Sequence, residues 1–349
     1  MTAPRPAARR ALRCALALGL LAALALAGAG RAGPIEAVTA VAIPVSDLER
    51  SEAFFHEVLG FERVAEAELA GEAWERLEGL APLRARTAVL RLGEERIELV
   101  AYRTPPGRPV PPDSRSNDRW FQHLAIVVRD MDRAYAELRR HGVSAVSPEP
   151  QRLPDWNPAA GGIRAFYFHD PDDHVLELIW FPPGKGDPRW QRAGDGLFLG
   201  IDHTAIAVAD TGASLAFYRD RLGLRVAGGS ENLGPEQERL NAVSGAHLRI
   251  TALRAARGPG IELLEYLAPR DGRPAPADLR ASDLLAWQTD LVAGDPAELA
   301  RELSSAKAAR VRGAPVRLPR AELGFQRAFL AADPDGHALR ITDRVGAAH

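Results

Sequence analysis

Isolated glutamates and histidines stand in apolar stretches of this sequence and are candidates for metal chemistry. Glu98, Glu177 and Glu262 each lie between aliphatic residues. His123 and His203 each precede an aliphatic run. Because side chains alternate between the faces of a strand, a lone carboxylate in such a run can simply face solvent. Close to imidazoles, however, it belongs to the nitrogen and oxygen donor set that divalent metals take in proteins.

The segments that carry these residues are repeated along the chain. Residues 51–60 recur as 214–223, and the turn Asp170 to His174 recurs at the same spacing as Asp333 to His337. Arg152-Leu153-Pro154 recurs at nearly the same spacing as Arg317-Leu318-Pro319. A nearly constant offset, with the matches in the same order, predicts the tandem duplication of a unit of about 160 residues.

A shorter repeat lies inside each unit. The stretch HLAIVVRD at 123–130 matches HTAIAVAD at 203–210, and residues 40–47 and 288–295 fit the same frame. Each copy begins with a run of strand character and reaches an Asp that can cap a following helix. A glycine such as Gly60 ends the helix, and further short apolar stretches follow. The pattern therefore predicts four βαβββ modules, which we number 1 to 4.

The modules predict two domains and a linker. Modules 1 and 2, at 36–103 and 120–182, form a first domain of residues 36–182. Modules 3 and 4, at 199–267 and 286–345, form a second domain of residues 199–345. Residues 183–198, rich in Pro, Gly and polar side chains, are the predicted linker between the two domains.

The four modules, with AFYRDRLGL at 216–224 and DPDGHALRI at 333–341, resemble the vicinal oxygen chelate superfamily over nearly all of residues 36–343. This group contains glyoxalase I, methylmalonyl-CoA epimerase, extradiol dioxygenases, and bleomycin and fosfomycin resistance proteins. The resemblance implies an α+β fold of two tandem domains, each a curled mixed sheet around a cleft. It also implies a divalent metal held by residues on the first and last strands of each module. It specifies the fold more closely than the reaction.

The implied ligand positions can be read from each module in turn. The first-strand positions are Ala40, His123, His203 and Gln288. The last-strand positions are Glu98, Glu177, Glu262 and Arg340.

The length of the repeat favours pairing of the modules in chain order. The first domain then has Glu98, His123 and Glu177 as metal ligands, with open positions for substrate. Either all three residues hold the ion, or, as the resemblance to glyoxalase-like proteins implies, one of the two glutamates detaches and acts as the catalytic base. In the second domain, Arg340 would repel a divalent ion and pair with Glu262, so this domain is expected to bind an anionic group through Arg340 or to be purely structural.

A second pairing stays open, in which modules 2 and 3 share one cleft. That cleft would hold the complete set of His123, Glu177, His203 and Glu262, and the outer modules would hold a defective one. The separation of His123 and His203 distinguishes the two pairings, because side chains within about 5 Å of each other can share a metal.

The expected substrate is a small molecule with vicinal oxygens. The loop at 152–162 contains Trp156 and Asn157, which are candidates for contacting it. We expect a metal-dependent lyase, isomerase or dioxygenase, with iron, manganese, zinc and nickel not distinguished. Extradiol chemistry is disfavoured by a set of one histidine and two carboxylates. The alternative is a metal-free protein that binds or sequesters a small molecule, as bleomycin resistance proteins do.

Residues 1–29 are predicted to be a signal peptide. Four arginines precede an uncharged run of Ala and Leu from Cys14 to Gly30, and Ala27-Gly28-Ala29 resembles a cleavage site. We therefore expect export to the periplasm or medium, where the cytosolic glutathione adduct of glyoxalase I is absent. Cys14 is the only cysteine of the 349 residues, so any metal of the mature chain is held by His and carboxylate. The net charge of −2 makes nucleic acid a poor partner, and we expect a monomer or homodimer that is free of the membrane after cleavage.

Overall fold

The computed structural model describes residues 34–192, 196–305 and 310–344. The predicted signal peptide lies outside the described residues. Within those residues, no helix has the length and apolar character needed to cross a membrane.

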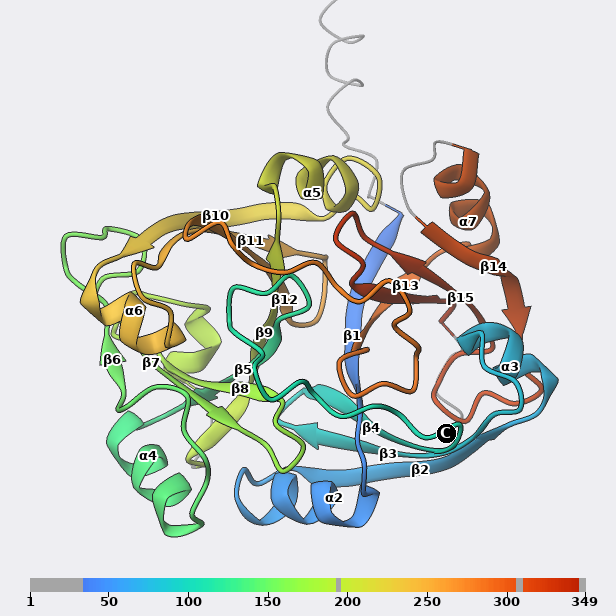
Figure 1. Ribbon diagram of the computed structural model, residues 1–349, viewed down its shortest axis with the longest axis horizontal. Helices are drawn as coiled ribbons and strands as arrows, with labels where there is room; N and C mark the ends of the chain where they lie inside the picture. Colours follow the sequence, from blue (N-terminus) through green and yellow to red (C-terminus); the bar gives the residue numbers. More distant parts are fainter. Residues whose placement is uncertain (1–33, 193–195, 306–309, 345–349) are drawn as a thin grey trace, which may run out of the picture. The chain divides into compact units, whose positions relative to one another are not determined.

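Two eight-stranded mixed sheets form the framework of residues 34–344 (Figure 1). Sheet A has the order β14-β15-β16-β13-β1-β4-β3-β2. Its strands are β1 (Ile35–Pro44), β2 (Glu62–Ala70), β3 (Arg84–Leu92), β4 (Glu95–Thr104), β13 (Gln288–Ala293), β14 (Arg310–Arg317), β15 (Arg327–Ala332) and β16 (Ala338–Thr342). Sheet B has the order β10-β11-β12-β9-β5-β8-β7-β6. Its strands are β5 (Gln122–Val128), β6 (Gln151–Arg152), β7 (Arg164–His169), β8 (Val175–Trp180), β9 (Phe198–Val208), β10 (Arg225–Leu233), β11 (His247–Arg254) and β12 (Gly260–Ala268).

Short helices connect the strands of each module. They are α2 (Leu48–Glu57), α3 (Glu72–Glu78), α4 (Met131–Arg140), α5 (Thr211–Tyr218), α6 (Pro235–Asn241), α7 (Pro296–Ser305) and the 3₁₀ helix η1 (Pro188–Gln191). The predicted caps are confirmed for three of them, because the side chains of Asp47, Asp130 and Asp210 each accept a hydrogen bond from a backbone N–H in the first turn.

The chain-order pairing of modules favoured by the sequence is wrong. Strand β5 of module 2 pairs antiparallel with β9 of module 3, and β1 of module 1 pairs antiparallel with β13 of module 4. Figure 1 accordingly shows sheet A combining the blue strands with the red ones, from the two ends of the described chain. The length of the repeat indicates only which segments of the chain were duplicated. Which two modules share a sheet depends on which of their first strands form hydrogen bonds with each other. All four first strands can do so, because each offers the same kind of edge.

Consecutive modules instead share hydrophobic cores. One core joins modules 1 and 2 through residues such as Phe55 and Phe61 on one side and Phe166 and Phe168 on the other. A second core joins modules 3 and 4, with Phe217 and Phe329 among its members. The two modules of each tandem domain are therefore neighbours through a core, while each sheet takes one module from each domain.

The two proline-rich linkers that precede β5 and β13 form a clasp, and their sequences are a further repeat: RPVPPDSRSND at 108–118 and RPAPADLRASD at 273–283. Arg108 of the first linker pairs with Asp278 and Asp283 of the second at 2.7 and 2.6 Å. Arg273 of the second pairs with Asp113 and Asp118 of the first, both at 2.6 Å. The clasp joins the entry strands of sheets B and A.

Candidate metal centre

Three ligand groups converge on the concave face of sheet B. The donor atoms of His123, Glu177 and His203 all lie within 4.8 Å of one another, and all three residues are buried. Glu177 Oε2 is 3.0 Å from His123 Nε2 and 3.5 Å from His203 Nε2. Glu262 Oε2 lies 3.5 Å from His203 Nε2 and supplies a fourth candidate donor. His123 and His203 thus lie close enough together to share one ion.

The donor geometry fits a bound cation better than a hydrogen-bonded cluster. His123 Nε2 has no hydrogen-bond partner among the described residues despite its contact with Glu177, and neither has its Nδ1. Two ligands that are each about 2.1 Å from an ion lie about 3.0 Å apart at 90° and about 3.4 Å apart at 109°. The observed nitrogen–oxygen separations match those values, so the residues present fit a divalent metal.

The strand register confirms the equivalence of the four modules that the sequence frames implied. In sheet B, two central alanines each lie between one histidine and one glutamate of the neighbouring strands. Ala125 lies between His203 and Glu177. Ala205 lies between His123 and Glu262. In sheet A, the corresponding sets are Gln288, Ala42 and Glu98, and Ala40, Asp290 and Arg340. The complete set of ligands therefore lies in sheet B, and the defective set lies in sheet A.

Glu98 does not join the other predicted ligands, which corrects the proposed trio of Glu98, His123 and Glu177. It lies in sheet A and forms a buried ion pair with Arg340, which also pairs with Asp290. Chain-order pairing predicted an ion pair between Arg340 and Glu262. This prediction is wrong, because the partners of Arg340 are Glu98 and Asp290. A guanidinium occupies the place where a ligand would have to be, so sheet A offers no described cation site.

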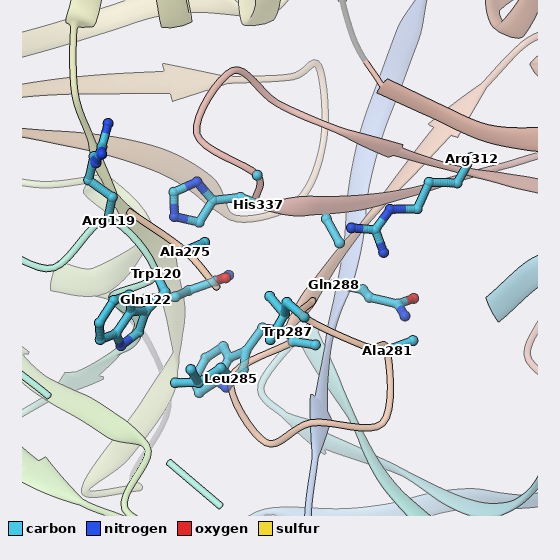
Figure 2. Close-up of a pocket in the computed structure, with 14 residues that line it drawn as sticks. Arg119, Trp120, Gln122, Ala275, Ala281, Leu285, Trp287, Gln288, Arg312 and His337 are labelled. Carbon is cyan, nitrogen blue, oxygen red and sulfur yellow. The ribbon is translucent and has the colours of Figure 1, made fainter. Parts of the chain in front are cut away.

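A small cavity lies near Gln288, between residues of sheet A, residues of sheet B and the two linkers. Figure 2 shows Gln288, Trp287 and His337 around it, with the Arg312 side chain extending from β14 towards Gln288. Its volume is about 20 Å³, which is room for a single water molecule. The Gln288 amide donates a hydrogen bond to the buried Glu78 at 2.7 Å instead of facing an open cleft.

A bulge in β9 brings Asp202 beside the metal ligands, and sequence reasoning missed this residue. The pairing of β5 with β9 shifts between Ile201 and His203, which turns Asp202 towards the same side as its neighbour. Asp202 Oδ2 lies 3.0 Å from His203 Nδ1. The other partners of the carboxylate are Trp190 Nε1 at 2.9 Å and Arg254 Nη2 at 2.9 Å. The contact leaves His203 Nε2 directed at the site.

The electrostatics of the cluster separate the two glutamates. Burial raises the pKa of the Glu177 carboxyl, but His123 and His203 outweigh burial and lower this pKa to about 2. Burial raises the pKa of Glu262, and His203 offsets this only in part. Burial also lowers the pKa of His203, but Glu262 and Asp202 raise it well above its usual value. The net shift of the pKa therefore differs between the two glutamates, because the neighbouring histidines outweigh burial at Glu177 but not at Glu262.

A cavity of about 700 Å³ opens over the cluster. The residues that line it include His123, Glu177, His203 and Glu262, as well as Tyr167, Ile179 and Leu264. This volume suits a small organic molecule.

The two predicted substrate contacts lie elsewhere. The side chain of Asn157 is buried and donates to the Asn232 side chain at 2.8 Å and to the Glu231 carbonyl, so it fastens the 152–162 loop to β10. Trp156 is 59% exposed and does not line the cavity. Leu153 and Ala160 of the same loop do line it. The loop therefore covers the cavity, but with other residues than those predicted.

Known proteins share the sequence pattern of the two duplicated units. The sequence model described as the Glyoxalase/Bleomycin resistance protein/Dioxygenase superfamily matches residues 37–178 and again 200–341. The chain is 38% identical over 163 residues to a 2-epi-5-epi-valiolone epimerase from Actinomyces sp, which covers 46% of this chain and 86% of that protein.

Two solved structures share the fold over most of the chain. Glyoxalase I from Zea mays superposes with a TM-score of 0.58 at 16% identity, covering 88% of this chain and 92% of that one. A putative dioxygenase from Bacillus subtilis superposes with a TM-score of 0.54 at 14% identity, covering 90% and 87%. At this level of identity, the likeness concerns the fold alone.

Proposed function

Because the chain belongs to the Glyoxalase/Bleomycin resistance protein/Dioxygenase superfamily, we propose that it is a divalent-metal-dependent enzyme that acts on a small molecule with vicinal oxygens. The observation that carries the proposal is the convergence of His123, Glu177 and His203 in the lining of the cavity of about 700 Å³. The site is built by the second and third modules together.

In this proposal, three residues are metal ligands and a fourth is the catalytic base. His123, His203 and Glu177 would hold the metal, with Asp202 orienting His203. When bound, a divalent ion supplies Lewis-acid polarisation of the substrate oxygens. We assign the role of catalytic base, which was predicted from the sequence for Glu98 or Glu177, to Glu262. Its carboxylate lies beside the candidate ligand His203, and burial raises its pKa. It would remove a proton from the carbon next to a substrate carbonyl and return it.

Proton transfer of this kind is the chemistry of an isomerase or epimerase. The similarity to 2-epi-5-epi-valiolone epimerase supports this assignment. Incubation in D₂O with a panel of small 2-hydroxyketones and 2-oxoacids, followed by NMR, tests it through deuterium incorporation. We expect incorporation with the wild type and a loss of at least about 100-fold with Glu262→Gln, since a positioned base contributes about 10²–10⁴ in rate.

Dioxygenase chemistry is a second candidate, and one observation favours it. A site with a single histidine would disfavour this chemistry, whereas His123 and His203 with Glu177 form two histidines and one carboxylate, the donor set of non-haem iron oxygenases. Oxygen consumption by the Fe²⁺-loaded protein with catechols would favour this candidate. Glu262 would then occupy a position that an oxygenase leaves open.

Metal analysis tests the proposal as a whole. The purified protein, depleted and then supplied in turn with Mn²⁺, Fe²⁺, Ni²⁺ and Zn²⁺, should retain one equivalent of at least one of these ions. His203→Ala should lose it, whereas His141→Ala, which removes a partly exposed histidine at the end of α4, should not. Retention of no stoichiometric metal would favour the alternative, a metal-free binding or sequestering protein.

We also propose that the enzyme acts outside the cytoplasm, on the basis of the signal peptide predicted at residues 1–29. N-terminal sequencing of the protein from the periplasm or medium tests this. A mature N-terminus close to residue 30 is expected, and intact protein retained in the cytosol would contradict the proposal.

A further inference from the structure

One cross-strand position carries opposite charges in sheet A and like charges in sheet B. In sheet A, Glu62 of β2 lies opposite Arg91 of β3, and the two side chains form an ion pair at 2.8 Å. The equivalent position of the duplicated unit, in sheet B, holds Arg225 of β10 opposite Arg254 of β11. The position thus holds an acid and an arginine in sheet A, but two arginines in the sheet that carries the candidate metal ligands.

Two like charges directly opposite each other destabilise a sheet unless something compensates them. Arg254 is compensated, because it donates to the Asp202 carbonyl at 2.8 Å and to its carboxylate at 2.9 Å. Arg225 is exposed, and no hydrogen bond or ion pair reaches it from the parts of the chain that the structure describes.

Arg225 is also exceptional among the arginines that line the large cavity. The other three each have an acidic partner: Arg189 pairs with Glu95 at 2.6 Å, Arg254 with Asp202 at 2.9 Å, and Arg257 with Glu36 at 3.4 Å. Among the described residues, the cavity therefore contains one guanidinium whose charge and five donors are free for a ligand.

The position of Arg225 relative to the metal ligands follows from the register. Arg225 lies opposite Arg254, a Cβ at Gly260 would be 3.0 Å from the Arg254 guanidinium, and Gly260 lies opposite His203. Arg225 is thus three strand spacings from His203 along one row of sheet B, roughly 14 Å between Cα atoms. Arg225 and His203 both line the cavity, so one ligand that extends along this row of the sheet can contact both.

We propose that the cavity binds a substrate with an anionic group, a carboxylate or a phosphate, which Arg225 receives while the vicinal oxygens face the metal ligands. This inference rests on the proposed function of the same site and adds the charge of the substrate to it. The anion restores the charge balance that the Glu62–Arg91 pair has in sheet A. Arginine suits this role because its planar fork donates two parallel hydrogen bonds to either anion.

Three hydroxamates that differ only in the tail test the proposal on the metal-loaded protein. Acetohydroxamate offers two vicinal oxygens and no charge on its tail, succinomonohydroxamate adds a carboxylate, and phosphoglycolohydroxamate adds a phosphate. By calorimetric titration, we expect at least one charged probe to bind about tenfold or more tightly than acetohydroxamate, as for a charge-assisted hydrogen bond. The probe with the larger gain identifies the preferred anion.

The variants separate the anion site from the metal site. In the wild type, the dissociation constant of acetohydroxamate should exceed that of the preferred charged probe. Arg225→Met should bring the ratio of these two constants close to one, and Arg225→Glu should bring it below one. Arg91→Met, the matched change in sheet A, should leave the wild-type ratio. Equal affinities for all probes in the wild type would overturn the inference alone, whereas no binding of acetohydroxamate would overturn the proposed function and the inference with it.

Discussion

Asp202 joins three different segments at the metal centre. Its carboxylate contacts His203 on its own strand, Trp190 on the 183–198 linker and Arg254 on β11. A carboxylate behind a metal-bound histidine fixes the tautomer and the ring orientation. Asp202 would therefore act on a bound metal only through His203.

We predict that Asp202→Asn weakens metal binding by about 10–100-fold, the usual cost of losing such an outer partner. A chelator competition titration measures this. Asp155→Asn, which alters an ion pair on the exposed side of the 152–162 loop, is the control and should bind metal as the wild type does. An unchanged affinity in Asp202→Asn would show that packing alone orients His203.

Arg340 compensates the buried acids of sheet A, where its guanidinium contacts both Glu98 and Asp290. We predict that Arg340→Met destabilises the protein by about 3–5 kcal/mol, because it leaves buried carboxylates without their cation. The triple variant with Glu98→Gln and Asp290→Asn should recover most of that loss. Urea denaturation measures both, and a triple variant as unstable as the single one would contradict the explanation.

The sequence predicted the four ligand positions of each sheet but not their partners. The resemblance predicted that Arg340 and Glu98 hold the positions equivalent to the candidate ligands Glu262 and Glu177. The register places all four at corresponding points of the two sheets. The partner of Arg340 was predicted wrongly, because the repeat does not encode which modules meet. Asp202 was missed because its direction depends on a bulge, and only its place next to His203 could have indicated it.

At the scale of elements, the two linkers hold the entry strands of both sheets. Asp283 is buried in this clasp and accepts from Arg108, Arg280 and the Arg108 backbone N–H. Although burial raises the pKa of Asp283, these donors outweigh it and lower the pKa to about 2. The repeat RPxPxDxRxxD that builds the clasp was readable in the sequence, at the same offset as the repeat of Arg152-Leu153-Pro154.

We predict that Asp283→Asn destabilises the protein by about 1–3 kcal/mol at pH 7, as for a lost hydrogen bond to a charged group. A carboxylate with a lowered folded-state pKa contributes stability above its unfolded pKa, here near 3.9, and loses it as the pH falls towards 2. The difference between wild type and variant, measured by urea denaturation, should therefore shrink below pH 4. Asp278→Asn removes the exposed partner of Arg108 and should cost less than about 1 kcal/mol. A pH-independent difference would contradict the prediction.

At the scale of the whole described chain, neither sheet belongs to one half of the sequence. The strand pairs β1–β13 and β5–β9 both join residues before 183 to residues after 197. The resemblance to the superfamily predicted the α+β class and the mixed sheets correctly, and the strand and helix signals of the sequence predicted the four modules. The sequence left the exchange of modules open as the second pairing and could not decide in its favour, since all four first strands are equivalent edges.

We therefore predict that a chain cut between Lys185 and Gly186 stays together. Residues 34–185 and 186–344, produced separately, should copurify as a one-to-one complex, because both sheets cross the cut. Only the complex should bind metal, since His123 and Glu177 lie in one part and His203 and Glu262 in the other. Size-exclusion chromatography with metal analysis measures this, and two separately folded, metal-binding parts would contradict the described topology.

The exchange of modules also sets the order in which the sheets can be completed during synthesis. All eight strands of sheet B lie between Gln122 and Ala268, so the whole metal-ligand set is available before β13 has been made. Strand β1 is synthesised first, but its partner β13 is synthesised much later. Until then, one edge of β1 has no partner strand. Such open edges are prone to wrong pairing. By contrast, the candidate metal ligands are all synthesised before any strand of module 4.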